Sequence, residues 1–311
     1  MRVMRVLITG AAGFTGYYLS KYIKKGSLAD EIFGIDLLKP VDESNCTWIQ
    51  GDVRNTVEIA NVLRQVKPTH IFHLAGLNFA EDPRQLFDIN VLGTLSLFEA
   101  VSAVKDDTDP QILLVGSCAE YGLVNDDELP ISEQNPLRPI SPYGVSKAAQ
   151  DLMGYQYYKS RGLKVIRTRA FNIVGPRQSD RFVCGALVKQ ISEIKQGSRD
   201  SVLEIGNLEV KRDFVDVHDV VRAYWRVMHS GRLGEVYNIG SGRSYSVEDI
   251  LKILLREASV EATIHQSPQR IRQVDIPKQV SDISKIRRET GWVPRISLEE
   301  SLREMLDHAY G

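Results

Sequence analysis

A glycine-rich loop between an apolar strand and a helix is the feature that most constrains how this chain folds. Residues 5–9 read Arg-Val-Leu-Ile-Thr and predict a short buried strand, residues 10–16 read Gly-Ala-Ala-Gly-Phe-Thr-Gly, and residues 17–25 follow a helical pattern. Glycines at this spacing allow a tight turn, a close approach of the backbone to a pyrophosphate, and close packing of the helix. The phosphates would lie at the amino end of the helix, so the loop predicts a dinucleotide site.

Strands and helices alternate through the first half of the chain. The next predicted strands are 31–36, 70–76 and 111–115. Helical patterns at 56–65 and 90–100 lie between them. This order indicates an α/β fold with a right-handed, doubly wound parallel sheet of the Rossmann-like kind, in which sites lie at the carboxyl ends of the strands.

Two acidic residues near strand ends suit the adenosine half of such a ligand. Asp36 ends the strand 31–36, 20 residues beyond Gly16, where a carboxylate accepts hydrogen bonds from ribose hydroxyls. This carboxylate would repel a 2′-phosphate and favour NAD(H) over NADP(H), but Lys39 lies close enough to blur that choice. Asp52 suits either the adenine amino group or the cap of the helix 56–65, and the sequence leaves both interpretations open.

Composition and charge exclude several other classes of protein. The 311 residues carry a formal net charge of −1, with 25% charged and 43% hydrophobic residues, as in ordinary globular proteins. No block of lysine or arginine points to nucleic acid, and no apolar run approaches the ~20 residues of a membrane span. The first residues run straight into a strand rather than into a targeting signal.

The cysteines and histidines predict no metal site. The three cysteines are widely spaced, which fits neither a disulfide framework nor a zinc site, and a cytoplasmic, reducing location is the simplest expectation. His70 and His73 both fall within a predicted strand, and we interpret both as sheet residues.

A tyrosine and a lysine one helical turn apart form the candidate catalytic pair. Ser141 is a good N-cap and Pro142 suits the first helical position, so a helix beginning there places Tyr143 and Lys147 on one face. A cation about 4 Å from a phenol, at an effective dielectric of about 20, is worth about 4 kcal/mol and would lower the pKa of the tyrosine by roughly three units. The pair alone is a weak signal, and a solvated helix face is the simpler interpretation.

The motifs together resemble the extended short-chain dehydrogenase/reductase family that acts on nucleotide sugars, over essentially the whole chain. They are the glycine loop 9–16, His-Leu-Ala-Gly at 73–76, Asn90, the loop at Ser117, and Tyr143-x-x-x-Lys147. The resemblance implies NADPH or NADH as cofactor and a catalytic triad. In that triad Ser117 orients the reacting oxygen, Tyr143 is the acid/base, and Lys147 lowers its pKa and holds the nicotinamide ribose.

The resemblance also implies a domain division and a candidate set of contacts. The dinucleotide-binding domain would be 1–170, with 213–242 crossing back, and a second, smaller α/β substrate domain would be 171–212 and 243–311. The candidate cofactor-binding residues are Gly10, Gly13, Phe14, Thr15, Gly16, Asp36, Asp52, Val53, Leu74, Ala75, Gly76, Asn90, Tyr143 and Lys147. The candidate substrate-binding residues are Ser117, Ala119, Glu120, Tyr143, Asn172, Val183, Arg212, Arg272 and Asp275.

The loop at Ser117 and the second half of the chain narrow the expected reaction. Dehydratases of the family resemble one another in carrying an acid just after the serine or threonine, and here Cys118 and Ala119 fill those positions. The stretch 206–217 is similar to GDP-mannose-processing members, in which Arg212 would clamp the diphosphate together with Arg272. Some related dehydratases carry a lysine at the position where this chain has Ala186.

We therefore expect NAD(P)H-dependent reduction of the C4 keto group of GDP-4-dehydro-6-deoxy-D-mannose, which gives GDP-D-rhamnose. A nucleotide-sugar 4-epimerase is the nearest alternative. A GDP-mannose 4,6-dehydratase and a nucleotide-sensing protein without catalysis fit the sequence less well. Met153, Tyr157 and Tyr158 form an apolar stripe on the helix from Tyr143, which suits either a core or, as the resemblance implies, a homodimer formed by paired helices.

Overall fold

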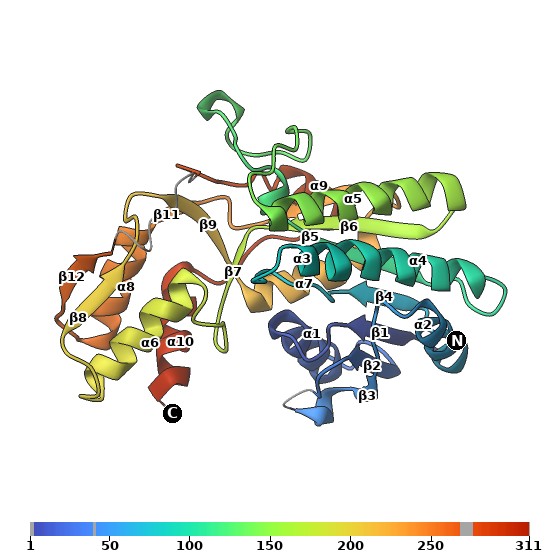
Figure 1. Ribbon diagram of the computed structural model, residues 1–311, viewed down its shortest axis with the longest axis horizontal. Coiled ribbons are helices and arrows are strands. Elements are labelled where there is room, and N and C mark those ends of the chain that lie inside the picture. The colour runs from blue at the N-terminus through green and yellow to red at the C-terminus, as the bar shows by residue number, and fades with distance from the viewer. Residues whose placement is uncertain (1–2, 40–41, 268–275, 311) are drawn as a thin grey trace.

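A seven-stranded parallel sheet forms the larger part of the computed structural model, which describes residues 3–39, 42–267 and 276–310 (Figure 1). The strand order is β10-β6-β5-β4-β1-β2-β3. The strands are β1 (Arg5–Thr9), β2 (Glu31–Asp36), β3 (Thr47–Gln50), β4 (His70–His73), β5 (Gln111–Ser117), β6 (Lys164–Ala170) and β10 (Val236–Ile239). Each neighbouring pair runs parallel, which confirms the predicted doubly wound sheet.

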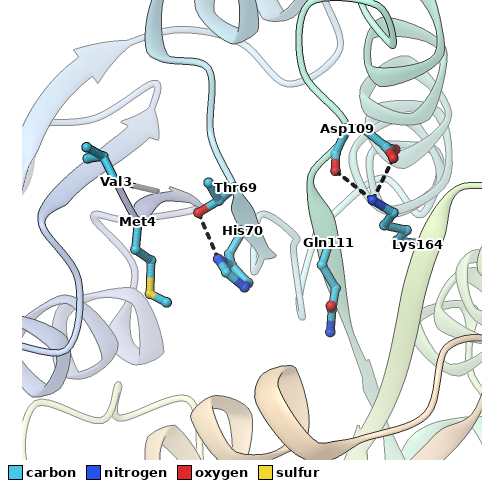
Figure 2. A pocket seen from close by; sticks show the side chains of 7 residues that line it. All are labelled: Val3, Met4, Thr69, His70, Asp109, Gln111 and Lys164. Carbon is cyan, nitrogen blue, oxygen red and sulfur yellow. Dashed lines mark hydrogen bonds and ion pairs between the residues drawn. The ribbon is translucent and has the colours of Figure 1, made fainter. Parts of the chain in front are cut away.

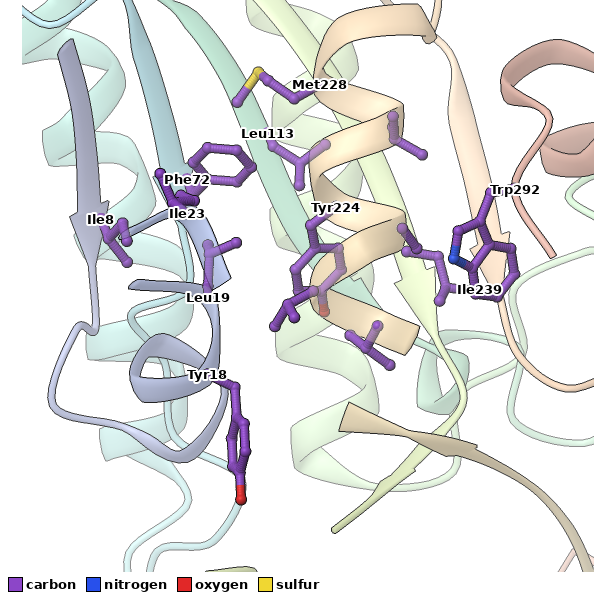
Figure 3. Packing of buried hydrophobic residues seen from close by; sticks show 14 of the residues in the cluster. Ile8, Tyr18, Leu19, Ile23, Phe72, Leu113, Tyr224, Met228, Ile239 and Trp292 are labelled. Carbon is purple, nitrogen blue, oxygen red and sulfur yellow. The ribbon is translucent and has the colours of Figure 1, made fainter. Parts of the chain in front are cut away.

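Helices cover both faces of this sheet because successive strand residues point to opposite sides. Val6 and Ile8 of β1 join one core cluster, whereas Leu7 between them joins the other. The first face carries α1 (Phe14–Lys25), α7 (Val217–Ser230) and α9 (Ser284–Thr290), and the second carries α2 (Thr56–Val66), α4 (Gly93–Ala103) and α5 (Pro142–Arg161). Figure 3 shows Tyr224 of α7 among the apolar side chains of the first cluster.

A second, smaller unit lies beside the sheet and has its own core. Its strands are β7 (Asn172–Val174), β9 (Lys211–Asp216) and β11 (Ser244–Ser246) in one sheet, and β8 (Val202–Ile205) and β12 (Thr263–Gln266) in another. The helices α6 (Val183–Lys195), α8 (Val247–Ala258) and α10 (Leu298–Tyr310) pack around a separate apolar cluster. In Figure 1 this unit lies to the left of the large sheet, and β7 and β9 are its strands nearest to that sheet.

The chain passes between the two units several times. It leaves the large sheet after β6, returns with α7 and β10, and returns again with α9 and the buried Trp292. The strand β9 belongs to the smaller sheet, so this return begins at Val217, whereas the sequence places it at residue 213. Residues Ser284–Thr290 also pack on the larger unit, although the sequence assigns them to the substrate domain.

The helix predicted at 90–100 is longer and less regular. The structure has α3 (Arg84–Phe87), a π-helical turn (Asp88–Leu92) and then α4. The stretch Arg84–Ala103 is long and apolar enough to cross a membrane by length and composition alone, although the sequence suggested no such run. Because Leu97, Phe98 and Val101 pack in the second core cluster, we interpret it as a core helix. Single 3₁₀ turns lie at Glu43–Asn45, Cys118–Glu120 and Asp126–Glu128.

Candidate active site

The glycine loop closes against the carboxyl ends of β1 and β4. Gly10 has a φ of +72°, and a Cβ atom there would lie 2.7 Å from the Ala75 backbone nitrogen. A Cβ atom at Gly16 would lie 2.3 Å from the Gly10 carbonyl oxygen, so both positions need glycine. The N-cap of α1 is Gly13, which offers no side-chain cap, and the first turn holds no acidic residue. The amino end of α1, at Phe14 and Thr15, is therefore suited to a phosphate, and the loop fits a dinucleotide.

Asp36 lies at the same edge of the sheet and contacts the glycine loop. Its Oδ2 accepts a hydrogen bond of 3.1 Å from the Ala12 backbone nitrogen, and its Oδ1 accepts one of 3.1 Å from the Leu38 nitrogen. A carboxylate held at the loop is well placed for the ribose hydroxyls of a dinucleotide bound there. Lys39 is exposed beyond the end of β2.

Asp52 does not cap the helix that follows it. The N-cap of α2 is Asn55, whose side chain accepts a hydrogen bond of 3.2 Å from the Glu58 nitrogen. Asp52 instead accepts hydrogen bonds of 2.9 Å from the backbone and Nε of Arg54, and this pairing lowers the pKa of Asp52. Val53 beside it is buried. Asparagine ranks with aspartate as an N-cap, so the sequence carried the correct signal three residues later.

Asn90 holds the segment that follows β4. It is completely buried in the π-helical turn, where its Oδ1 accepts a hydrogen bond of 2.8 Å from the Leu77 nitrogen. Its Nδ2 donates to the Leu77 carbonyl and to the Ser146 hydroxyl, each at 2.9 Å. The Asn90 amide is therefore engaged by the Leu77 backbone and the Ser146 hydroxyl. This clamp positions Gly76, where a Cβ atom would lie 2.9 Å from Asn90 Oδ1.

Ser117 ends β5 and begins a single 3₁₀ turn, Cys118–Glu120. Its hydroxyl accepts a hydrogen bond of 3.2 Å from the Ala119 nitrogen, which leaves its own proton available to an outside acceptor. Glu120 Oε1 accepts a hydrogen bond of 2.7 Å from the Ser117 nitrogen, and Glu120 is fully buried. Glu120 therefore faces the protein interior and not a bound sugar, which corrects its place among the candidate substrate contacts. Ala119 is half-buried.

The helix α5 starts as the sequence predicts. Ser141 is the N-cap and accepts a hydrogen bond of 3.0 Å from the Gly144 nitrogen, and Pro142 occupies the first turn. Tyr143 and Lys147 follow on one face of the helix. The hydroxyl of Tyr143 lies close enough to Ser117 for the serine to lower its pKa.

The expected effect of Lys147 on the tyrosine is not observed. Burial raises the pKa of Tyr143, and the group that lowers it is Ser117. Lys147 is buried and its Nζ donates to the Val115 carbonyl oxygen at 2.6 Å and to Gln150 Oε1. Because its ammonium is drawn toward β5, desolvation dominates and lowers the pKa of Lys147 to about 8.

The substrate-side candidates are placed in part. Asn172 opens β7 and donates a hydrogen bond of 3.0 Å to the Asp213 carbonyl oxygen, and Val183 begins α6. Arg212 on β9 donates to the Ile276 carbonyl oxygen at 2.5 Å. Arg272 and Asp275 lie outside the described residues. Phe79 after β4 contacts Phe182 at the start of α6, with ring centroids 5.2 Å apart, so the two units meet here.

Two further features lie away from this edge. A hollow of about 290 Å³ opens at the amino ends of the strands, beside Met4, His70, Gln111 and Lys164 (Figure 2). In an open α/β sheet, ligands bind at the opposite, carboxyl ends. His70 and His73 lie in β4, as predicted.

A group of potential metal ligands, Asp216, His218 and Glu304, lies where α7 meets α10. The Asp216 carboxylate is already engaged there: Oδ1 accepts from the His218 backbone nitrogen at 2.7 Å and Oδ2 from the Ser301 hydroxyl at 2.6 Å. These contacts close the start of α7 against α10.

The parallel sheet and the glycine loop define a class: a dinucleotide-binding protein of the Rossmann-like kind. A family model described as GDP-mannose 4,6 dehydratase matches residues 7–305, so the chain belongs to that family. It is 33% identical to the GDP-6-deoxy-D-mannose reductase of Pseudomonas aeruginosa, over 97% of this chain and 96% of the relative.

Two solved structures are similar over nearly all of both chains. One, described as RMD from Pseudomonas aeruginosa complexed with NADPH, has a TM-score of 0.85 at 30% identity and covers 99% of each chain. The other, a UDP-glucose 4-epimerase of Thermus thermophilus with NAD, has a TM-score of 0.87 at 28% identity and covers 99% of each chain. The chain is therefore an NAD(P)-dependent enzyme acting on CH–OH groups of nucleotide sugars, and its cofactor is a nicotinamide dinucleotide.

Proposed function

We propose that this enzyme reduces the C4 keto group of GDP-4-dehydro-6-deoxy-D-mannose with NADPH or NADH and so forms GDP-D-rhamnose. The observation that carries the proposal is the makeup of the turn after β5. Ser117 and Tyr143 lie together there, while Cys118 is buried, Ala119 has no ionisable group, and Glu120 is turned inward. A ketone reduction needs a proton donor at the oxygen, whereas elimination of water needs a base beside C5 as well.

The side chains of the site divide the work of such a reduction. Tyr143 donates its proton to O4 of the sugar, and its raised pKa keeps the phenol protonated at neutral pH. Ser117 donates a hydrogen bond to the same oxygen and keeps its proton, and the Lys147 ammonium stabilises the negative charge that develops there. When bound, the reduced nicotinamide supplies the hydride. Arg212, whose guanidinium forms a planar fork, would bind the diphosphate.

The rival function is a 4-epimerase, which is favoured by the similarity to the Thermus thermophilus enzyme. An epimerase uses the same three side chains but regenerates its cofactor in each turnover. The test is to supply the keto sugar with NADPH or NADH and to follow absorbance at 340 nm together with the sugar product. One mole of cofactor oxidised per mole of GDP-deoxyhexose supports reduction. Interconversion of 4-epimers without net oxidation would establish the epimerase.

We also propose that the enzyme is a homodimer formed through α5. The stripe Met153, Tyr157 and Tyr158 packs on the second core cluster and is therefore core, in contrast to its predicted role in the dimer. The exposed apolar residues of the helix are instead Val145, Leu152 and Tyr155, which are 41%, 58% and 44% exposed. Their spacing places them near one face of the helix. Leu152→Glu should give a monomer by light scattering, and an unchanged dimer would reject this face.

A further inference from the structure

A chain of buried charges lies directly behind the proposed site. Glu120 Oε2 pairs with Arg169 Nε at 2.9 Å, and Arg169 Nη2 pairs with Asp151 Oδ2 at 2.8 Å. Arg167 completes the chain by pairing with the same Asp151 oxygen at 2.8 Å. Glu120, Asp151 and Arg169 are at most 4% exposed. Buried ion pairs add little net stability compared with apolar residues of the same volume, so stability alone does not account for this chain.

The chain of charges joins the two elements that carry the catalytic side chains. At one end, Glu120 Oε1 fixes the backbone of Ser117 through the hydrogen bond of 2.7 Å to its nitrogen. At the other end, Asp151 lies on α5, one turn beyond Lys147 and two turns beyond Tyr143. Position 116, next to Ser117, requires glycine, because a Cβ atom there would lie 2.4 Å from Glu120 Oε1. The distance between Ser117 and α5 is therefore set partly by these ion pairs.

Glu120 also acts on the two titratable side chains of the site. Its charge raises the pKa of Lys147, against the desolvation that lowers it, and raises the pKa of Tyr143 in addition to burial. Desolvation, followed by the neighbouring Asp151, raises the pKa of Glu120 itself to about 8, while Arg169 opposes this change. The charged or titratable groups that face it are Tyr143, Lys147 and Asp151 on α5, Arg169 on β6, and Cys118 and Tyr121 on its own segment.

We propose that Glu120 is a positioning residue that holds Ser117 against α5, and that its carboxylate, once ionised in alkaline solution, favours the charged form of Lys147. The proposal rests on the reductase function above and deepens it. Because desolvation lowers the pKa of Lys147 to about 8, we expect the loss of this proton to limit activity in alkaline solution. Removal of the negative charge at position 120 lowers the pKa of the ammonium, so activity should fail at a lower pH.

The test is the pH profile of kcat for the wild-type enzyme and for Glu120→Gln. The variant should show a lower kcat, an alkaline limb that moves to lower pH by roughly one unit, and a KM for the sugar that changes little. A purely structural Glu120 would lower kcat and leave the limb in place, and that result would overturn the proposal. Asp219→Asn is the matched control, because Asp219 is also buried and accepts backbone hydrogen bonds of 2.6 and 2.9 Å, from Arg295 and Ile296.

A second variant covers the case in which Glu120→Gln does not fold. Glu120→Asp keeps the carboxylate but shortens the side chain. The alkaline limb of its pH profile should stay at the wild-type pH, and its kcat should fall because the hydrogen bond to the Ser117 nitrogen is lost. A wild-type kcat in this variant would overturn the positioning role. If the wild-type enzyme itself does not reduce the keto sugar, the proposed function fails. The role of Glu120 is then judged by the pH dependence of unfolding in wild type and variant, which needs no turnover.

Discussion

Two capping boxes in this molecule begin with a serine whose backbone nitrogen binds an acidic side chain, but the pKa of that acid moves in opposite directions in the two. Ser117 precedes the turn after β5, and Ser246 precedes α8 in the smaller unit. In each box an acidic side chain three residues on accepts a hydrogen bond from the serine nitrogen, at 2.7 Å for Glu120 and 2.9 Å for Asp249. Burial raises the pKa of Glu120 to about 8, whereas hydrogen bonds from Ser246 lower the pKa of the exposed Asp249.

The difference shows that the local motif fixes the backbone while its surroundings decide what the charge does. Glu120 lies between β6 and α5, where desolvation outweighs the ion pair with Arg169. Asp249 lies at the solvent-exposed start of a helix, where the helix dipole and hydrogen bonds favour the carboxylate. Substitutions near the first box should therefore change kcat, and substitutions in the second box should change only the free energy of unfolding.

The largest effect is expected at the phenol beside the first box. Tyr143→Phe removes the proton donor, and kcat should fall about 10²–10⁴-fold because general acid catalysis is worth that much. Tyr155→Phe, on the exposed face of the same helix, is the matched control and should keep the wild-type kcat. Steady-state kinetics with the keto sugar and NADPH measure both. A folded Tyr143→Phe enzyme with the wild-type kcat would reject Tyr143 as the proton donor.

The same substitution in each box compares the two regions most closely. Ser117→Ala removes a hydrogen-bond donor to the developing oxyanion, so kcat should fall by about 10²-fold. Ser246→Ala should leave kcat unchanged and reduce the free energy of unfolding by about 1 kcal/mol, the usual cost of a lost N-cap. Kinetics and urea denaturation distinguish the two outcomes. Equal effects of the two substitutions on kcat would reject a catalytic role for Ser117.

A further contrast between the two boxes is expected in the pH dependence of stability. The pKa of Glu120 is raised in the folded state, so the folded protein binds more protons than the unfolded chain between about pH 4.5 and about pH 8. Stability should therefore fall as pH rises through this window, and Glu120→Gln should lack this fall. The pKa of Asp249 is lowered, so its contribution is present above the unfolded pKa of 3.8 and is lost in more acidic solution. Urea midpoints from pH 3 to 9 for wild type, Glu120→Gln and Asp249→Asn test both signs.

The sequence predicts the elements of the fold well where apolar runs meet glycine or a cap. The strands 5–9 and 31–36 have the predicted bounds, and the predicted N-cap at Ser141 is confirmed. The start of the helix predicted at 90–100 is not predictable from local propensity. The π-helical turn around Asn90 depends on the hydrogen bonds that Asn90 makes with the Leu77 backbone.

The site is predictable in its residues but not in its electrostatics. Spacing correctly places Tyr143 and Lys147 on one helix face, yet it gives no hint that the Val115 carbonyl, 32 residues away, draws the ammonium toward β5. The Ser-x-x-Glu pattern at 117–120 is a capping-box signature, but it precedes a single 3₁₀ turn rather than an apolar helix, so rules for helix starts do not single it out. The ion pair of Glu120 with Arg169 spans 49 residues and depends on the register of β5 against β6.

The most direct measurement of the central claim is the stoichiometry of the reaction with GDP-4-dehydro-6-deoxy-D-mannose. With either NADPH or NADH, the purified enzyme should oxidise one cofactor for each keto sugar consumed, and the product should be GDP-D-rhamnose. With GDP-mannose alone it should release no water and form no keto sugar. Efficient dehydration of GDP-mannose, or turnover of the keto sugar without oxidation of the cofactor, would contradict the account.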